Sequence, residues 1–166
     1  LQTALRLTPA HGAASAWRFE RADALTSNPW AAAALDILSL RLWDNRFSTV
    51  SRLLLSGAQW QGPQRAAATR LETQLRERCA PRIHLRDFVT HADPGFRDGW
   101  EALEQVVRDE PRRATPGDWV EHFGRRLQAL GWGRSDERDS EQWQSTEAVR
   151  ESLQQLAVLD RQLGAI

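Results

Sequence analysis

The sequence predicts an all-α fold, an irregular bundle of about seven helices. Apolar residues recur at helical spacing along most of the chain, and no stretch alternates convincingly with the two-residue period of a strand. Capping residues followed by proline mark several helix starts. The 166 residues suffice for one domain. We expect an irregular segment at 1–27 and a single helical domain at 28–166. Because the chain lacks methionine, we expect it to be a fragment of a longer protein.

The stretch 28–57 organises the predicted bundle. Asn28 can cap a helix and Pro29 suits its first position. From there to Trp43 apolar residues go almost all the way round the predicted helix, and the polar stripe is limited to Asp36 and Ser39. A helix this apolar and this short belongs at the centre of a soluble bundle rather than in a membrane.

The other predicted helices begin or end at turn signals. Thr115 can cap a helix whose first residue is Pro116, and Asp118 can complete a capping box. The turn at 93–95 separates two further helices. The predicted ranges after the first helix are 48–57, 63–78, 83–89, 96–109, 116–130 and 139–163.

Composition excludes several classes of function. The 22 basic residues, all arginine, balance 22 acidic residues, so no overall field attracts nucleic acid or an anionic membrane. Without lysine, the chain cannot contain a phosphate-binding loop of the GxxxxGK[ST] type. The single cysteine excludes an intramolecular disulfide and fits a reducing compartment, so we expect a cytoplasmic protein. No apolar run has the length of a membrane span.

Neither a metal site nor a catalytic site is predicted. The ligand-type side chains closest in sequence are Cys79, His84, His91 and Asp93, and their spacing fits no zinc pattern. No serine lies in a G-x-S-x-G elbow. A small enzyme with an acid-lined cleft stays open as a third hypothesis, based on Asp36, Glu101, Glu104 and Asp118. We expect no cofactor, and no small-molecule substrate is evident.

Arginines in the second half of the chain form the best candidate for nucleic-acid binding. Arginine binds phosphate in a bidentate manner, and a nearby tryptophan can stack on a base. Acidic residues interleave with these arginines, which favours the alternative of a solvated mixed-charge surface. The candidate residues are Arg112, Arg113, Arg125, Arg126, Trp132 and Arg134.

Seven of the eight tryptophans fall into two groups. Those at apolar helix positions are expected in the core: Trp30, Trp43, Trp100 and Trp119. Those in turns or near a helix start are candidates for an interface with the rest of a longer protein: Trp60, Trp132 and Trp143.

Five motifs together resemble a known family. They are NPWAAAALDILSLRL at 28–42, FSTVSRLLLSG at 47–57, Arg70-Leu71-Glu72, TPGDWVEHFGRRLQALGW at 115–132 and DSEQWQSTEAVRESLQQLAVLD at 139–160. Their order resembles that in the bacterial "probable DNA repair protein" family, which is related to AddB-like and RecB-family helicase–exonuclease subunits. The resemblance covers about residues 20 to 163. Two departures are Trp132-Gly133 in place of Trp-Pro-Gly and Ser56-Gly57 in place of Ser-Pro.

The resemblance implies a fold similar to the helical 2B-type insertion of UvrD-like helicases. In such proteins a PD-(D/E)XK nuclease domain follows, and the parent is an ATP-dependent helicase/exonuclease. Neither set of motifs falls within this chain, so no catalytic residue is carried over. The implied role is a non-catalytic subdomain that packs against motor-like domains, with guidance of DNA left open. The alternative is a helical protein–protein interaction scaffold unrelated to DNA.

Overall fold

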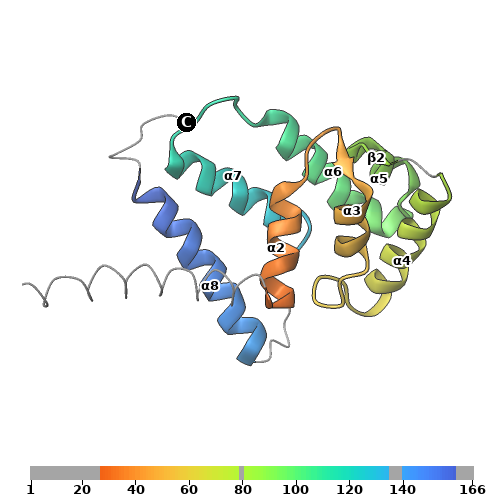
Figure 1. Cartoon of the computed structure of the whole chain (residues 1–166), viewed down its shortest axis with the longest axis horizontal. Coiled ribbons are helices and arrows are strands. Elements are labelled where there is room, and N and C mark those ends of the chain that lie inside the picture. Colours follow the sequence, from red (N-terminus) through yellow and green to blue (C-terminus); the bar gives the residue numbers. More distant parts are fainter. Residues whose placement is uncertain (1–26, 79–80, 135–139, 160–166) are drawn as a thin grey trace, which may run out of the picture.

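The computed structural model describes residues 27–78, 81–134 and 140–159, and within them the chain forms a bundle of seven helices (Figure 1). The all-α prediction is therefore confirmed, and residues 1–26 of the predicted irregular segment lie outside the described part. The helices are α2 (Pro29–Ser39), α3 (Phe47–Leu54), α4 (Gly62–Glu77), α5 (Leu85–His91), α6 (Pro94–Asp109), α7 (Pro116–Ala129) and α8 (Ser140–Ala157).

Helix α2 lies at the centre of the bundle. Asn28 caps it, because the side-chain oxygen accepts hydrogen bonds from the amides of Trp30 at 2.9 Å and Ala31 at 3.3 Å. Helices α7 and α8 pack against one side of α2 (Figure 1). On the other side α3 packs against α2 and α4, and α4 in turn contacts α5 and α6. Ile37, near the end of α2, is fully buried. None of the helices in the described ranges combines the length and apolarity that crossing a bilayer needs.

The first helix is shorter than the sequence predicts. It ends at Ser39 rather than Trp43, because Leu40 already has an extended backbone with ψ of 142°. The guanidinium of Arg126, on α7, donates hydrogen bonds to the carbonyls of Leu38 at 2.7 Å and Leu40 at 2.8 Å. Carbonyl groups at a helix end need such donors, and here a distant residue supplies them.

The loop that follows is held by Asn45, which is buried. Its side chain accepts from the amide of Arg41 at 2.8 Å and donates to the carbonyl of Arg41 at 2.7 Å and of Ile83 at 3.0 Å. Asp44 takes a left-handed conformation with φ of 71°. Trp43 consequently lies in a loop and is 66% exposed, so the prediction of a core position for Trp43 is wrong.

A short antiparallel ladder also departs from the predicted pattern. Strands β1 (Asn45–Arg46) and β2 (Arg82–Ile83) have two residues each, with Asn45 opposite Ile83 and Arg46 opposite Arg82. Two residues are too few to show an alternating pattern in the sequence. The ladder matters because it ties the loop after α2 to the segment before α5.

Aromatic rings fill the core between α4, α5 and α6. Trp60 and Phe96 meet edge to face with their centroids 4.8 Å apart, and Phe88 and Trp100 lie 4.4 Å apart. Trp60 is only 2% exposed, and its indole nitrogen donates to the carbonyl of Leu53 at 2.8 Å. The core position predicted for Trp100 is confirmed, whereas Trp60 is no interface residue.

Candidate functional site

Arg126, one of the predicted nucleic-acid contacts, lies inside the molecule. It is 7% exposed, and its guanidinium forms a bidentate ion pair with the Glu110 carboxylate, with Nε and Oε1 2.6 Å apart. The same group also holds the two carbonyls at the end of α2. Arg126 therefore joins α7 to α2 and to the end of α6, and it has no surface to offer a phosphate.

Trp132 is likewise unavailable for stacking on a base. It is 7% exposed, and its indole nitrogen donates to the carbonyl of Trp30 at 3.0 Å, which ties the turn after α7 to the start of α2. Of the three tryptophans suggested as interface residues, Trp143 is the exposed one, at 54%.

The four other candidate arginines are exposed but do not form one patch. Arg112 and Arg113 precede α7, whereas Arg134 follows it. With 14 residues, α7 spans about 20 Å, so its two ends cannot contact the same phosphate. Arg125, between them, has a surface ion pair with Glu121 at 3.4 Å. The set predicted from the sequence is therefore divided between two ends of a helix.

Three of the four candidate acids, Asp36, Glu104 and Asp118, have separate structural partners. Asp36 is buried and accepts two hydrogen bonds from Arg52, one of them 2.8 Å long from Nε. Hydrogen bonding to Asp36, together with its charge, raises the pKa of the Arg52 guanidinium above its ordinary value. Asp118 completes the capping box of α7. In the described ranges no three His, Cys, Asp or Glu side chains are grouped as a metal site would require, and Cys79 lies outside those ranges.

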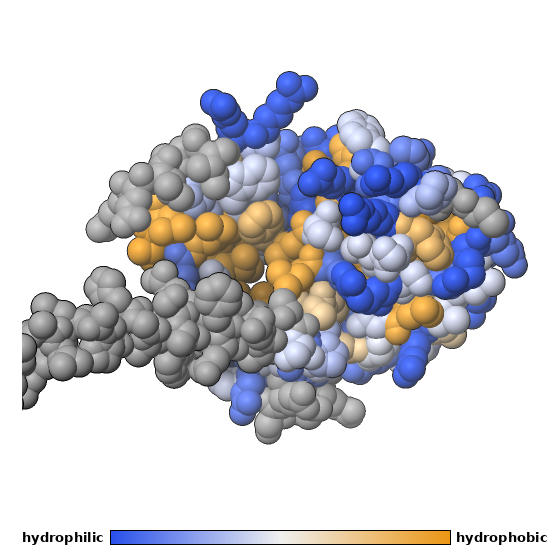
Figure 2. Space-filling view, in the orientation of Figure 1, coloured by the Kyte–Doolittle hydropathy of each residue, from blue (hydrophilic) through white to orange (hydrophobic). Residues whose placement is uncertain are grey.

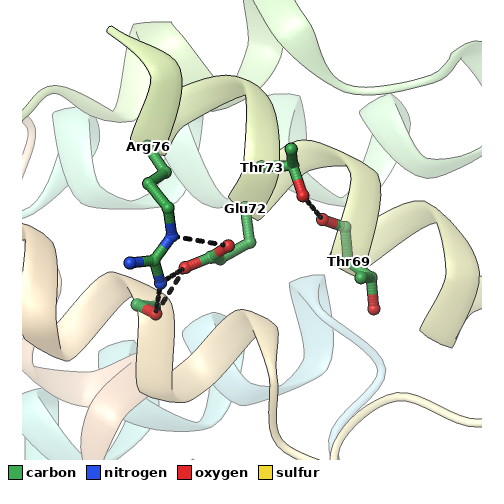
Figure 3. A network of polar contacts seen from close by, with 5 residues as sticks. Thr69, Glu72, Thr73 and Arg76 are labelled. Atoms are coloured by element: carbon green, nitrogen blue, oxygen red, sulfur yellow. Dashed lines mark hydrogen bonds and ion pairs between the residues drawn. The ribbon is translucent and has the colours of Figure 1, made fainter. Parts of the chain in front are cut away.

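A polar network joins α3 to α4 (Figure 3). The buried carboxylate of Glu72 accepts a 2.6 Å hydrogen bond from the Ser51 hydroxyl and is paired with Arg76 one turn along α4. Burial opposes ionisation of Glu72, but hydrogen bonds from Arg76 and Ser51 and the charge of Arg76 outweigh it, so its pKa lies below the ordinary value. Both oxygens of this carboxylate accept hydrogen bonds from residues within the bundle, which is typical of a structural role.

A groove of about 700 Å³ lies beside the loop after α2 and was not predicted from the sequence. Its walls come from that loop, from α5 with the residue before it, and from α6. The lining residues are Leu42, Trp43, His84, Arg86, Asp87, Glu104 and Arg108. We call this the Trp43 groove. Because Leu40 and Leu42 continue the apolar pattern of the first helix up to Trp43, the sequence predicts a core position for Trp43 rather than a surface one.

An apolar face lies where the first half of α7 meets the second half of α8. Its members are half-buried or exposed: Val120, Phe123, Leu153, Leu156, Ala157 and Val158. Trp119 stacks on Phe123 with the ring centroids 5.7 Å apart. Figure 2 shows hydrophobic residues gathered over α7 and α8, whereas the end that holds β2, α5 and α6 is mostly hydrophilic. At the end of this face Val158 is 72% exposed, so part of the apolar face is open to solvent.

The groove and the apolar face are two candidate binding surfaces within the described ranges. Comparison of the chain with models of protein families, with curated proteins and with solved structures gave no match. Function is therefore inferred from the residues and their arrangement.

Proposed function

We propose that this chain is a non-catalytic helical subdomain of a DNA repair helicase/exonuclease-like protein in the cytoplasm. In this proposal it packs against the motor-like domains of its parent through the apolar face. The order and spacing of the motifs at 28–42, 47–57 and 115–132 support the DNA repair context. The remaining domains of the parent chain are the main partners, and DNA is the second.

The apolar face is the observation that carries the packing role. Helices α7 and α8 bury one seam against each other and against α2, yet Phe123 and Leu156 next to this seam stay only half-buried. The stacked pair of Trp119 and Phe123 adds a rigid aromatic surface at the rim. Aromatic and aliphatic groups left half-covered at a helix junction are typical of a surface that another domain covers.

Photo-crosslinking in the parent protein tests this role. A photoreactive amino acid replaces Val120 on the apolar face, and a second variant carries it at Thr90, which is exposed on α5 at the other end of the bundle. We expect position 120 to crosslink to the motor-like domains of the same chain and position 90 not to do so. Mass spectrometry of the crosslinked peptides identifies the partner residues.

The alternative role gives a different result in the same experiment. Crosslinks from position 120 to a separate protein, with none to the parent chain, would favour the scaffold unrelated to DNA. No crosslink from position 120 at all would contradict both roles for this face.

The non-catalytic part of the proposal has its own test. The isolated chain should neither hydrolyse ATP nor cut single- or double-stranded DNA in the presence of Mg²⁺ or Mn²⁺. Metal-dependent cleavage that co-purifies with the chain would contradict it.

A further inference from the structure

We propose that the Trp43 groove binds single-stranded nucleic acid, with a base stacked on the Trp43 indole and phosphates held by Arg86 and Arg108. This surface is separate from the apolar face, and the inference does not depend on that face. It rests on three observations: an exposed indole on a firmly held loop, two exposed guanidinium groups over one buried carboxylate, and further arginines along the adjoining ladder.

The indole of Trp43 is presented on a loop with many hydrogen bonds. The Asn45 side chain holds both backbone groups of Arg41, and the carbonyl of Leu42 accepts from the amide of Leu85 at 2.9 Å. Because the Trp43 ring is 66% exposed, its burial contributes little to the stability of the fold. A base can stack on such a ring without first ordering the loop, which lowers the entropic cost of binding.

The two guanidinium groups of the groove share one buried carboxylate. Glu104 accepts a hydrogen bond from Arg108, and one of its oxygens lies 3.5 Å from Nη1 of Arg86. The Glu104 side chain is 9% exposed, against 73% for Arg86 and 56% for Arg108. Each guanidinium has five N–H donors, so both keep donors directed to solvent that can bind a phosphate.

The remaining acid of the groove is used inside helix α5. Asp87 accepts a 2.8 Å hydrogen bond from the amide of His84 and so completes the capping box at the start of α5. Glu104 and Asp87 thus have structural partners, while the arginines stay exposed. The two arginines and two acids of the lining give no net formal charge, but its most exposed charged groups are the two guanidiniums.

Arginines of the short ladder add positive charge beside the groove. Arg46 and Arg82 are exposed and lie directly opposite each other, an arrangement that like charges disfavour. The nearest acid is Asp44, 3.2 Å from Arg82 and itself exposed. Alternation along the strand places Arg82 on the same side as His84, which lines the groove. An anionic ligand would relieve this repulsion.

The combination favours single-stranded nucleic acid over other anions. In a duplex both faces of each base are already stacked, so only an unpaired strand offers a base to Trp43. An acidic peptide could use the arginines, but its carboxylate side chains offer no aromatic ring to stack on the indole.

Binding of a fluorescently labelled oligothymidylate of about 16 nucleotides to the whole chain tests the proposal. We expect Trp43→Ala to weaken binding by about 5- to 150-fold, because one stacked base is lost. Arg86→Gln should lower the slope of log affinity against log salt by about 0.7. Matched controls are Trp143→Ala, which removes the other exposed indole of the described residues, and Arg150→Gln, which changes an exposed arginine on α8; both should bind like the wild type.

Three results would overturn the proposal: no saturable binding at low salt, equal affinity of Trp43→Ala and the wild type, or equal losses for Trp43→Ala and Trp143→Ala. Tight binding of a polyglutamate peptide with the same dependence on Trp43 would assign the groove to acidic peptides instead. Thermal unfolding of each variant shows that its fold is retained. None of these results bears on crosslinking from position 120, so the two proposals fail separately.

Discussion

Arg126 connects parts of the molecule that lie far apart in the sequence. Its ion pair with Glu110 is shielded from water on both sides, with side-chain exposures of 9% and 7%. The carbonyls that it holds, on Leu38 and Leu40, belong to residues 88 and 86 positions away. A buried ion pair adds little net stability by itself, but removing one partner leaves an uncompensated charge.

We therefore expect Arg126→Ala to lower the free energy of unfolding by about 3–5 kcal/mol. The neighbouring Arg125→Ala removes an exposed ion pair and should change it by less than about 0.5 kcal/mol. Urea unfolding followed by circular dichroism measures both values. If both variants lost a similarly small amount of unfolding free energy, the contacts of Arg126 would not be what stabilises the packing of α7 on α2.

Glu72 should make stability depend on acidic pH. Its pKa in the folded protein lies below that in the unfolded chain, because Arg76 and Ser51 together outweigh the effect of burial. Its stabilising contribution is thus fully present above the unfolded pKa of about 4.3. It is lost as the pH falls through the lower folded pKa.

Glu72→Gln should accordingly flatten the fall in the free energy of unfolding between about pH 5 and pH 3. Urea unfolding at several pH values measures this slope. Gln74→Ala, an exposed change on the same helix, serves as a control and should follow the wild-type curve. Parallel curves for Glu72→Gln and the wild type would contradict the role of this carboxylate.

Among the elements, α6 and α7 approach closely at Gly99. A methyl group added at Gly99 would lie 3.2 Å from the carbonyl oxygen of Ala129, which is backbone and cannot swing aside. Gly124, within α7, has no atom of this kind within 4 Å of the same added group. Both glycines lie within helices, but only Gly99 packs closely against a neighbouring helix.

Alanine at these two positions should have opposite effects. Gly124→Ala should raise the free energy of unfolding by about 1 kcal/mol through helix propensity. Gly99→Ala should lower it by about 1–3 kcal/mol, because α6 and α7 must move apart. Thermal and urea unfolding compare the two. Stabilisation by both would mean that the contact at Gly99 can relax at no cost.

The ends of the elements show how local signals compare with tertiary ones. Asn28 and Thr115 cap their helices as predicted, because a cap bonds to amides two or three residues away. The end of α2 depends instead on Arg126, which lies 86 and 88 positions from the carbonyls it holds, and on Asn45, which ties the loop to Ile83, 38 positions away. A sequence pattern that is apolar through Trp43 cannot reveal such competitors.

At the scale of the whole molecule, the two proposed surfaces lie at different ends of the bundle. The apolar face belongs to α7 and α8, and the Trp43 groove belongs to the loop after α2 with α5 and α6 (Figure 1). A domain with this arrangement can be fixed to a neighbour at one end and contact a strand at the other. The overall charge balance conceals this arrangement, because the Glu104 carboxylate is buried beneath the two exposed arginines of the groove.

The sequence by itself determined the all-α class, the order of the seven helices in the described ranges and most of their starts, because helical periodicity and caps act over a few residues. It also predicted that Trp100 is core. Only the tertiary structure decided that Arg126 and Trp132 are buried, that Trp43 is exposed, and that the predicted arginines do not form one patch. The physical reason is distance along the chain: Trp132 bonds to a carbonyl 102 residues away. Burial is thus set by partners that no local pattern contains.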